Sequence, residues 1–184
     1  VKEWLAENYM SKSLIDFGCN TGNFSIAISS SVKQVIAFDE DIRSVDALYL
    51  HCKKNKLDNI NCLWGSISDP APSLGWNNSE RQSLNERLKA DVGLALALIH
   101  HLAITNYISF EKMADFFAGC CEELLIEFVP KTDDKVSLLL LHRKDIFHWY
   151  TLENFTSAFT TRFIEQKRHT FSNQRIVFHF IKKQ

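Results

Sequence analysis

Short apolar runs alternate with stretches of helical periodicity along almost the whole chain. Runs such as 13–17 and 91–99 are typical of strands buried on both faces, whereas apolar residues at offsets of three and four indicate helices. Strands are predicted at 13–17, 33–38, 60–64, 91–99, 123–129, 162–168 and 175–181, and helices at 22–31, 41–56, 79–88, 109–118, 133–141 and 152–161. This alternation predicts an α/β fold in which helices cover both faces of a mostly parallel sheet. The last two strands have no helix between them and are predicted to form an antiparallel pair.

The length of 184 residues suits one domain and is short for two. We therefore expect a single domain over residues 1–184. The chain begins with Val1 instead of Met, so we expect this domain to be a trimmed chain or part of a longer polypeptide. No apolar run reaches the roughly 18 residues of a membrane-spanning helix, which argues against membrane insertion.

The charges are balanced, with 21 Lys and Arg against 22 Asp and Glu. No net field recruits nucleic acid or an anionic membrane, so a small molecule is the favoured partner. The five cysteines are odd in number and lack C-x-x-C spacing, which favours a reduced, cytoplasmic setting over a disulfide framework. No metal site is predicted, and the composition leaves the oligomeric state open.

The most informative segment is 16–22, with the sequence DFGCNTG, between the first predicted strand and the first long helix. Ligands of open α/β sheets bind at such strand–helix connections. Gly18 and Gly22 lack Cβ atoms where the backbone must turn or approach a ligand, and Asn20 tolerates positive φ. The spacing matches neither the dinucleotide fingerprint nor the phosphate loop. The segment is therefore either a binding loop of another kind or a tight turn without a ligand.

A second candidate for ligand binding lies where Asp39, Glu40 and Asp41 follow the second predicted strand. A carboxylate there can accept hydrogen bonds from both hydroxyls of a ribose, and charge-assisted bonds of this kind are worth about 1.5–3 kcal/mol each. The competing interpretation is that one of these acids caps the next helix. We assign the ribose contact to Asp39 and the cap to Asp41.

The pattern D-x-G-x-N-x-G of residues 16–22 resembles the first motif of class I S-adenosylmethionine-dependent methyltransferases. The resemblance covers nearly the whole chain and implies a Rossmann-like, doubly wound, seven-stranded and mostly parallel sheet with a terminal antiparallel strand pair. It implies S-adenosylmethionine as cofactor and S-adenosylhomocysteine as product. The stretches DPAPSLGWNN, LALALIHHLAI and IEFVPKTDD further resemble a subgroup of these enzymes known by similarity to a rhizobial nodulation protein. The implied cofactor-binding residues are Asp16, Gly18, Cys19, Asn20, Gly22, Asp39, Glu40, Ser66, Ile67 and Ala97.

The chain departs from the family pattern at two positions. Asn20 stands where the first motif usually has a third glycine, and Ser66 stands where the family has an acid near the adenine amino group. Asp69 could replace that acid, or Ser66 could bind through its hydroxyl. Both interpretations of the adenine contact stay open at this point.

Candidate catalytic residues accompany the fourth and fifth predicted strands. His100 and His101 directly follow the fourth strand, and an imidazole with the ordinary pKa near 6.5 is a ready base at neutral pH. The alternatives for His100 are hydrogen bonding to backbone carbonyls and, less favoured, a metal site. Glu127 lies within an apolar strand, where a carboxylate is costly unless it is paired or faces a cleft. It is interpreted equally as a base or substrate contact and as a structural ion pair with Lys131 or Arg143.

The four large side chains at 147–150 (FHWY) precede the last predicted helix. Such a cluster is either a lid over an acceptor pocket or a hydrophobic plug that packs the helix. The plug is the commoner arrangement for consecutive large rings.

These features predict methyl transfer from S-adenosylmethionine to an acceptor, with a small molecule or a lipid-linked saccharide favoured. One alternative is a cofactor-binding but inactive module, which the missing third-motif acid favours. The other is a protein or nucleic-acid methyltransferase. Its N-methylating branches often carry Asn/Asp-Pro-Pro-aromatic after the fourth strand, where residues 97–100 read ALIH. The N-methylating kind is therefore disfavoured.

Overall fold

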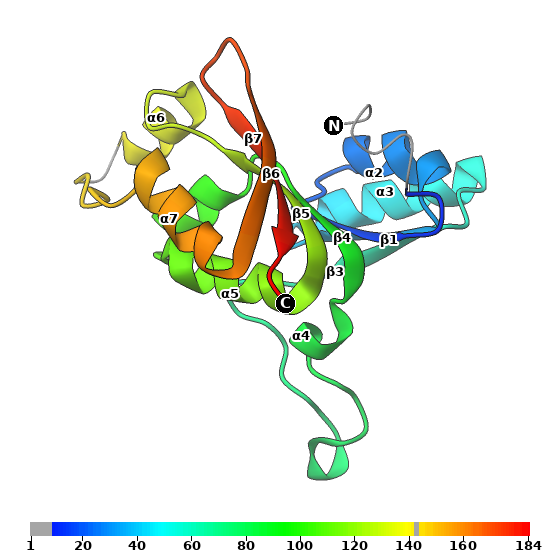
Figure 1. Cartoon of the computed structure of the whole chain (residues 1–184). Helices are drawn as coiled ribbons and strands as arrows, with labels where there is room; N and C mark the ends of the chain where they lie inside the picture. Colours follow the sequence, from blue (N-terminus) through cyan, green and yellow to red (C-terminus); the bar gives the residue numbers. More distant parts are fainter. Residues whose placement is uncertain (1–8, 142–143) are drawn as a thin grey trace. The chain divides into compact units, whose positions relative to one another are not determined.

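The computed structural model describes residues 9–141 and 144–184. These residues form two compact units, the first up to Leu94 and the second from Ala95 onward, and each is described by itself (Figure 1). The strands are β1 (Ser13–Phe17), β2 (Gln34–Asp39), β3 (Ile60–Trp64), β4 (Ala90–Ala95), β5 (Cys121–Phe128), β6 (Phe163–Thr170) and β7 (Ile176–Lys182). Their order, β3-β2-β1-β4-β5-β7-β6, is the predicted Rossmann-like, mostly parallel topology. A single domain over residues 1–184 stays a prediction. No helix in the described part of the chain is long and apolar enough to cross a membrane.

The first unit is built on parallel strands. β1 pairs with β2 on one side and with β4 on the other, and β3 extends the sheet beyond β2. Leu14, Ile15 and Val35 are fully buried, as expected for central strands covered on both faces. The helices are α2 (Asn23–Ile28), α3 (Ile42–Asn55) and α4 (Leu84–Arg87), with 3-10 turns at Ser29–Ser31 and Trp76–Asn78.

Asp41 fixes the start of α3. Its carboxylate accepts the hydroxyl of Ser44 at 2.7 Å and the backbone N–H of Arg43 at 3.1 Å. These hydrogen bonds, that of Ser44 first, hold the pKa of Asp41 below its ordinary value. The predicted capping role of Asp41 is confirmed.

A helix was predicted at 79–88, but α4 contains only the last turn of that segment. Its N-cap is Ser83, which forms a capping box with Glu86. Before the cap, the backbone of Arg81 forms an isolated antiparallel bridge with that of Leu74. This pairing withdraws residues 79–82 from the helix, so the predicted start was wrong.

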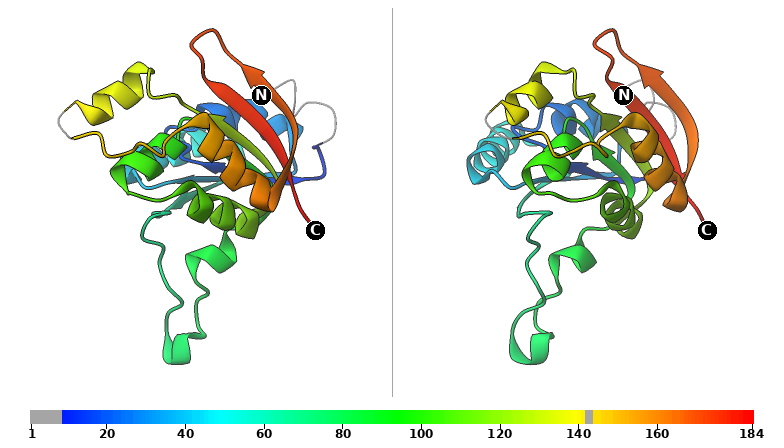
Figure 2. Two further views of the ribbon diagram at one scale, coloured as in Figure 1. Left: turned by 60° about the vertical axis from the view of Figure 1, so that its left-hand side comes forward. Right: turned by 90° about the vertical axis from the view of Figure 1, so that its left-hand side faces the viewer.

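The second unit contains the antiparallel strands, with β7 between β5 and β6. The predicted closing pair is therefore confirmed. The helices are α5 (Phe110–Cys120), α6 (Asp134–Leu140) and α7 (Leu152–Arg162), preceded by a π-helical turn at His101–Thr105. α5 and α7 lie side by side in both views of Figure 2.

Aromatic rings fill the core of the second unit. Phe128 contacts Phe155 and Tyr150, with ring centroids 5.3 and 5.5 Å apart. Phe147 and Tyr150 are almost fully buried, and the hydroxyl of Tyr150 donates to the carbonyl of Val129 at 2.8 Å. The segment 147–150 therefore packs as a plug through these two rings, and the lid interpretation was wrong for them.

Two glycines are expected to respond in opposite ways to alanine. Gly22 has a φ of 81°, and a Cβ there would lie 2.3 Å from Cδ1 of Leu48. Gly22→Ala should lower the free energy of unfolding by about 2 kcal/mol or more, through left-handed strain and overpacking. An added Cβ on Gly119 in α5 meets nothing within 4 Å, so Gly119→Ala should raise it by about 0.5–1 kcal/mol. Denaturant unfolding measures both, and a neutral Gly22→Ala would contradict the turn described.

Candidate functional site

The loop between β1 and α2 has the conformation that its glycines predict. Gly18, Asn20 and Gly22 have φ values of 74°, 50° and 81°. The backbone N–H groups of Gly18 and Cys19 both donate to the carbonyl of Phe38, at 2.9 and 3.1 Å, which ties the loop to the end of β2. Asn20 therefore occupies the left-handed region where the family pattern has glycine, as its tolerance of positive φ allows.

Asp39 is the half-buried last residue of β2. One carboxylate oxygen accepts the N–H of Asn20 at 2.7 Å, and the other accepts the N–H of Asp41 at 2.8 Å. The carboxylate is thereby held in one orientation beside the loop. Since each oxygen has two lone pairs, about two acceptor positions remain for a ligand. The structure thus joins the glycine loop and the acid after the second strand, which the sequence singled out separately.

Asp16 lies just before the loop and is only 3% exposed. It accepts the hydroxyl of Ser25 at 2.6 Å, which links β1 to α2. Burial raises the pKa of Asp16 to about 6; hydrogen bonds from Ser25 oppose this shift, and the charge of Asp39 adds to it. Ser25 was missed by the sequence analysis, because a serine within a helix gives no signal by itself.

Cys19 is the buried member of the loop, and burial raises the pKa of its thiol. It therefore offers a neutral, apolar contact. All five cysteines are free thiols. Among residues 9–141 and 144–184, no group of three His, Cys, Asp or Glu side chains could hold a metal ion.

Glu40 and Ser66 meet beyond the ends of β2 and β3. The hydroxyl of Ser66 donates to a carboxylate oxygen of Glu40 at 3.2 Å, and the N–H of Asp69 donates to Ser66 Oγ at 3.3 Å. Trp64, at the end of β3, donates its indole N–H to the backbone carbonyl of Glu40 at 3.0 Å. Ile67 is half-buried. Trp64 was missed by the sequence analysis, although a large ring directly before Gly65 was visible.

β4 ends at Ala95, earlier than the predicted end at residue 99. Ala97 has a φ of 50°, so the chain leaves strand geometry there. The N–H of His101 then donates to the carbonyl of Leu98 at 3.0 Å, which begins a helical turn. The prediction that His100 and His101 directly follow a strand was therefore wrong. The positive φ could not be predicted, because alanine does not favour the left-handed region.

His100 is only 2% exposed, whereas His101 is exposed. Its Nδ1 atom is buried and makes no hydrogen bond within the part of the chain that the structure describes. Burial lowers the pKa of His100 to about 3; the charges of His101 and Arg175 add to this shift, and Asp133 opposes it. The imidazole is therefore uncharged at neutral pH, and the assumption of an ordinary pKa was wrong.

Glu127, in β5, is 8% exposed and forms an ion pair. Its partner is Arg175, with 3.6 Å between Nη1 and Oε1. The structural ion pair is thus present, with a partner that was not predicted. Lys131 pairs with Asp145 at 2.8 Å instead, and Arg143 lies outside the described residues.

Glu127 and Arg175 belong to a longer chain of contacts. Glu127 Oε2 accepts the backbone N–H of Ala97 at 2.7 Å. Arg175 donates two hydrogen bonds to the carboxylate of Asp133, at 2.7 and 3.0 Å, and thereby lowers the pKa of that carboxyl. Arg175 and Asp133 were not predicted as site residues, because no local pattern links residues so far apart in the chain.

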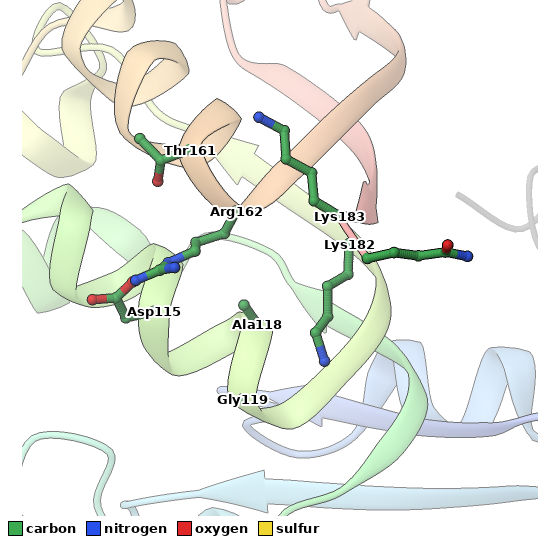
Figure 3. A pocket seen from close by; sticks show the side chains of 8 residues that line it. Asp115, Ala118, Gly119, Thr161, Arg162, Lys182 and Lys183 are labelled. Atoms are coloured by element: carbon green, nitrogen blue, oxygen red, sulfur yellow. The ribbon is translucent and has the colours of Figure 1, made fainter.

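A surface pocket in the second unit lies between α5, α7 and the end of β7 (Figure 3). The ion pair of Arg162 and Asp115, at 2.6 Å, is part of its wall. Its lining residues are Asp115, Ala118, Gly119, Thr161, Arg162, Lys182, Lys183 and Gln184. The predicted site residues are not among these described lining residues, so the pocket is a separate feature of this unit.

Comparison with known proteins identifies related sequences. The family described as tRNA (Uracil-5-)-methyltransferase matches residues 2–71. The nodulation protein NoeA of Rhizobium meliloti (strain 1021) is 37% identical over 166 residues, which are 88% of this chain and 34% of NoeA. The chain thus spans about a third of the length of this relative.

Solved structures share the fold. The N-methyltransferase NodS from Bradyrhizobium japonicum WM9, in complex with S-adenosyl-L-homocysteine, has a TM-score of 0.63 at 12% identity, covering 95% of this chain and 80% of NodS. The PH0226 protein from Pyrococcus horikoshii OT3 has a TM-score of 0.67 at 12% identity, covering 99% of this chain and 88% of that protein. At such identities the likeness establishes the fold alone.

Asp16→Asn is expected to change how stability depends on pH. Folding raises the Asp16 pKa from 3.8 to about 6, so the native state keeps a proton that the unfolded state releases. The stability from this proton is present below the unfolded pKa and is lost as pH rises through about 6. The free energy of unfolding of Asp16→Asn minus that of the wild type should therefore be larger near about pH 8 than near about pH 4. Urea unfolding measures this, with the exposed Asp46→Asn in α3 as control; an equal difference at both pH values would contradict it.

Proposed function

We propose that this chain, which has the fold of class I S-adenosylmethionine-dependent methyltransferases, binds S-adenosylmethionine at the β1–α2 loop and catalyses methyl transfer to an acceptor. The bound cofactor supplies a sulfonium methyl group for in-line displacement, and S-adenosylhomocysteine is the product. The observation that carries the proposal is the carboxylate of Asp39, held beside the loop by two backbone N–H groups.

Asp39 is suited to a ribose. Its two bonds to Asn20 and Asp41 orient the carboxylate before any ligand arrives, which lowers the entropy lost on binding. The remaining lone pairs can accept two neighbouring hydroxyls. Gly18 lets the backbone approach the rest of the cofactor, with Asn20 and the neutral Cys19 beside it. Gly22 closes the turn against Leu48. Asp16 supports this loop from inside the unit.

We assign the adenine side to Glu40, Ser66 and Ile67. The hydroxyl of Ser66 is bonded to the carboxylate of Glu40, so Glu40 brings a negative charge to the place where the family has an acid. The departure at Ser66 is thereby compensated by a neighbour from the end of β2. Ile67 supplies apolar surface for the adenine ring. The cofactor contact of Ala97 stays a prediction.

The comparisons support the cofactor more strongly than the acceptor. The matched span 2–71 contains the loop, Asp39 and Ser66 and ends before Ala97 and His100. The match therefore supports a cofactor-binding half that this chain shares with that family. It gives no support for tRNA as the acceptor. The structure of NodS with S-adenosyl-L-homocysteine supports the same cofactor.

For the acceptor we favour a small molecule or a lipid-linked saccharide, since the balanced charge of the chain provides no field for nucleic acid. A protein or nucleic-acid acceptor is the alternative, and cofactor binding without turnover would indicate an inactive module. The five free thiols fit a reduced, cytoplasmic setting.

His100 is the candidate base on the acceptor side. Its imidazole is uncharged and weakly basic because of burial and neighbouring positive charge. A weak base suffices for a hydroxyl acceptor, whose proton becomes strongly acidic as the new bond to carbon forms.

Asp39→Ala is expected to weaken S-adenosylhomocysteine binding about 10- to 100-fold, because it removes bonds worth about 1.5–3 kcal/mol. Calorimetric titration measures the affinity, and circular dichroism checks that the fold persists. Asp39→Asn keeps one carbonyl acceptor and should lose less. Asp46→Ala, exposed on α3, is the matched control. Unchanged affinity in Asp39→Ala would remove the ribose assignment, and no binding by wild type at about millimolar cofactor would overturn the proposal.

His100 is expected to contribute no break to the pH profile of kcat/KM between about pH 5 and 8, since it loses its proton at about pH 3. The acceptor for this assay is found by a metabolite screen for mass shifts. His100→Ala should lower turnover and leave S-adenosylhomocysteine binding intact, with the exposed His148→Ala as control. A break near pH 6.5 that disappears in His100→Ala would contradict the buried, neutral imidazole, and unchanged turnover would remove its role as base.

A further inference from the structure

The turn after β4 contains a strained residue. Ala97 has a φ of 50°, in the left-handed region, which is unfavourable for a residue with a Cβ. Directly after it, the N–H groups of His101 and Leu102 donate to the carbonyl of Leu98, at 3.0 and 3.3 Å. Ala97 therefore sets the direction in which the turn carrying His100 begins. A conformation of this kind persists only where its surroundings hold it.

Glu127 holds Ala97. Its carboxylate accepts the N–H of Ala97 at 2.7 Å, a short distance typical of a charge-assisted bond. Glu127 is 8% exposed, so water competes little for this bond. The strained backbone is thus tied to β5 by a buried charge.

Arg175 explains how this charge is kept in an apolar strand. It directly precedes β7, in which Val177 pairs with Glu127, and its Nη1 lies 3.6 Å from Glu127 Oε1. Two further guanidinium nitrogens bind Asp133, which caps α6 by accepting the N–H of Lys135 at 2.9 Å. The guanidinium therefore has a fixed position between two carboxylates.

We propose that Glu127 and Arg175 are positioning residues for methyl transfer. Glu127 holds Ala97 in the left-handed conformation, Arg175 holds Glu127, and together they fix the turn that carries His100. The link to methyl transfer rests on the proposed function. Both oxygens of Glu127 are engaged, one by a backbone N–H and one by the facing guanidinium, so Glu127 is assigned to positioning and not to proton transfer.

Amide hydrogen exchange of Ala97, followed by NMR on the whole chain, tests the first step. Glu127→Ala should speed exchange at Ala97 about 10- to 100-fold, because the acceptor is lost. Glu127→Gln keeps a carbonyl acceptor and should speed it less than about tenfold. Glu123→Gln, on the same strand and paired with His179, is the matched control. Unchanged exchange in Glu127→Ala, or equal acceleration by Gln and Ala, overturns the proposal.

Ala97→Gly tests the strain, since glycine adopts a φ near 50° without the Cβ penalty. In the Glu127→Ala background it should restore part of the protection of the amides of His101 and Leu102, whose bonds to Leu98 begin the turn. No recovery in the double variant overturns the role of Ala97. Once an acceptor is known, the same variant should recover turnover, which a lost base would not allow.

Arg175→Gln tests the second step. It should speed exchange at Ala97 several-fold, whereas Arg168→Gln, which removes the exposed pair with Glu165 in the same hairpin, should not. Equal effects of the two variants overturn the role of Arg175. These exchange rates need no cofactor, so calorimetry with S-adenosylhomocysteine on the same samples separates failure of this proposal from failure of the proposed function.

Discussion

The candidate cofactor site depends on the hydrogen bonds that the carboxylate of Asp39 accepts. This carboxylate accepts the N–H of Asn20 from the β1–α2 loop and the N–H of Asp41 from the cap of α3. One side chain thereby ties the loop after β1 to the helix after β2. Because parallel strands bring their carboxyl ends to one edge, this is where a short carboxylate can reach both connections. The loop and the capping residue of α3 are therefore both bonded to the same side chain.

A carboxylate also holds a loop residue in the second unit, but there it serves the protein's own structure. Asn20 and Ala97 both have a φ of 50°, and each donates its N–H to a buried or half-buried carboxylate, Asp39 or Glu127, at 2.7 Å. In both places a strand-end acid stabilises a left-handed residue in a loop that follows another strand. The carboxylates differ in what surrounds them: Glu127 faces the guanidinium of Arg175, whereas Asp39 is held by two backbone N–H groups. Asp39 keeps acceptor capacity for a ligand, whereas Glu127 is committed to the protein.

Local chemistry decided how much the sequence could predict. β1 and β3 have the predicted bounds, and Asp41 caps α3 as expected, because apolar runs and capping residues act on their neighbours. The end of β4 was not predictable, since an apolar run continues past a positive φ at an alanine. The partner of Glu127 is Arg175, which folding brings from a distant turn. The low pKa of His100 results first from burial, which depends on the packing of the whole unit. Contacts between residues far apart in the chain produce no periodic pattern in the sequence.

The two carboxylates have partners in different units of the chain. The contacts of Asp39 come from the first unit, from the β1–α2 loop and the cap of α3. The contacts of Glu127 come from the second unit and include Arg175, which precedes β7 in an exposed hairpin. Substitutions in that hairpin can change the setting of His100 through Arg175 and Glu127. Such substitutions leave the hydrogen bonds that hold Asp39 in place, because those bonds come from Asn20 and Asp41.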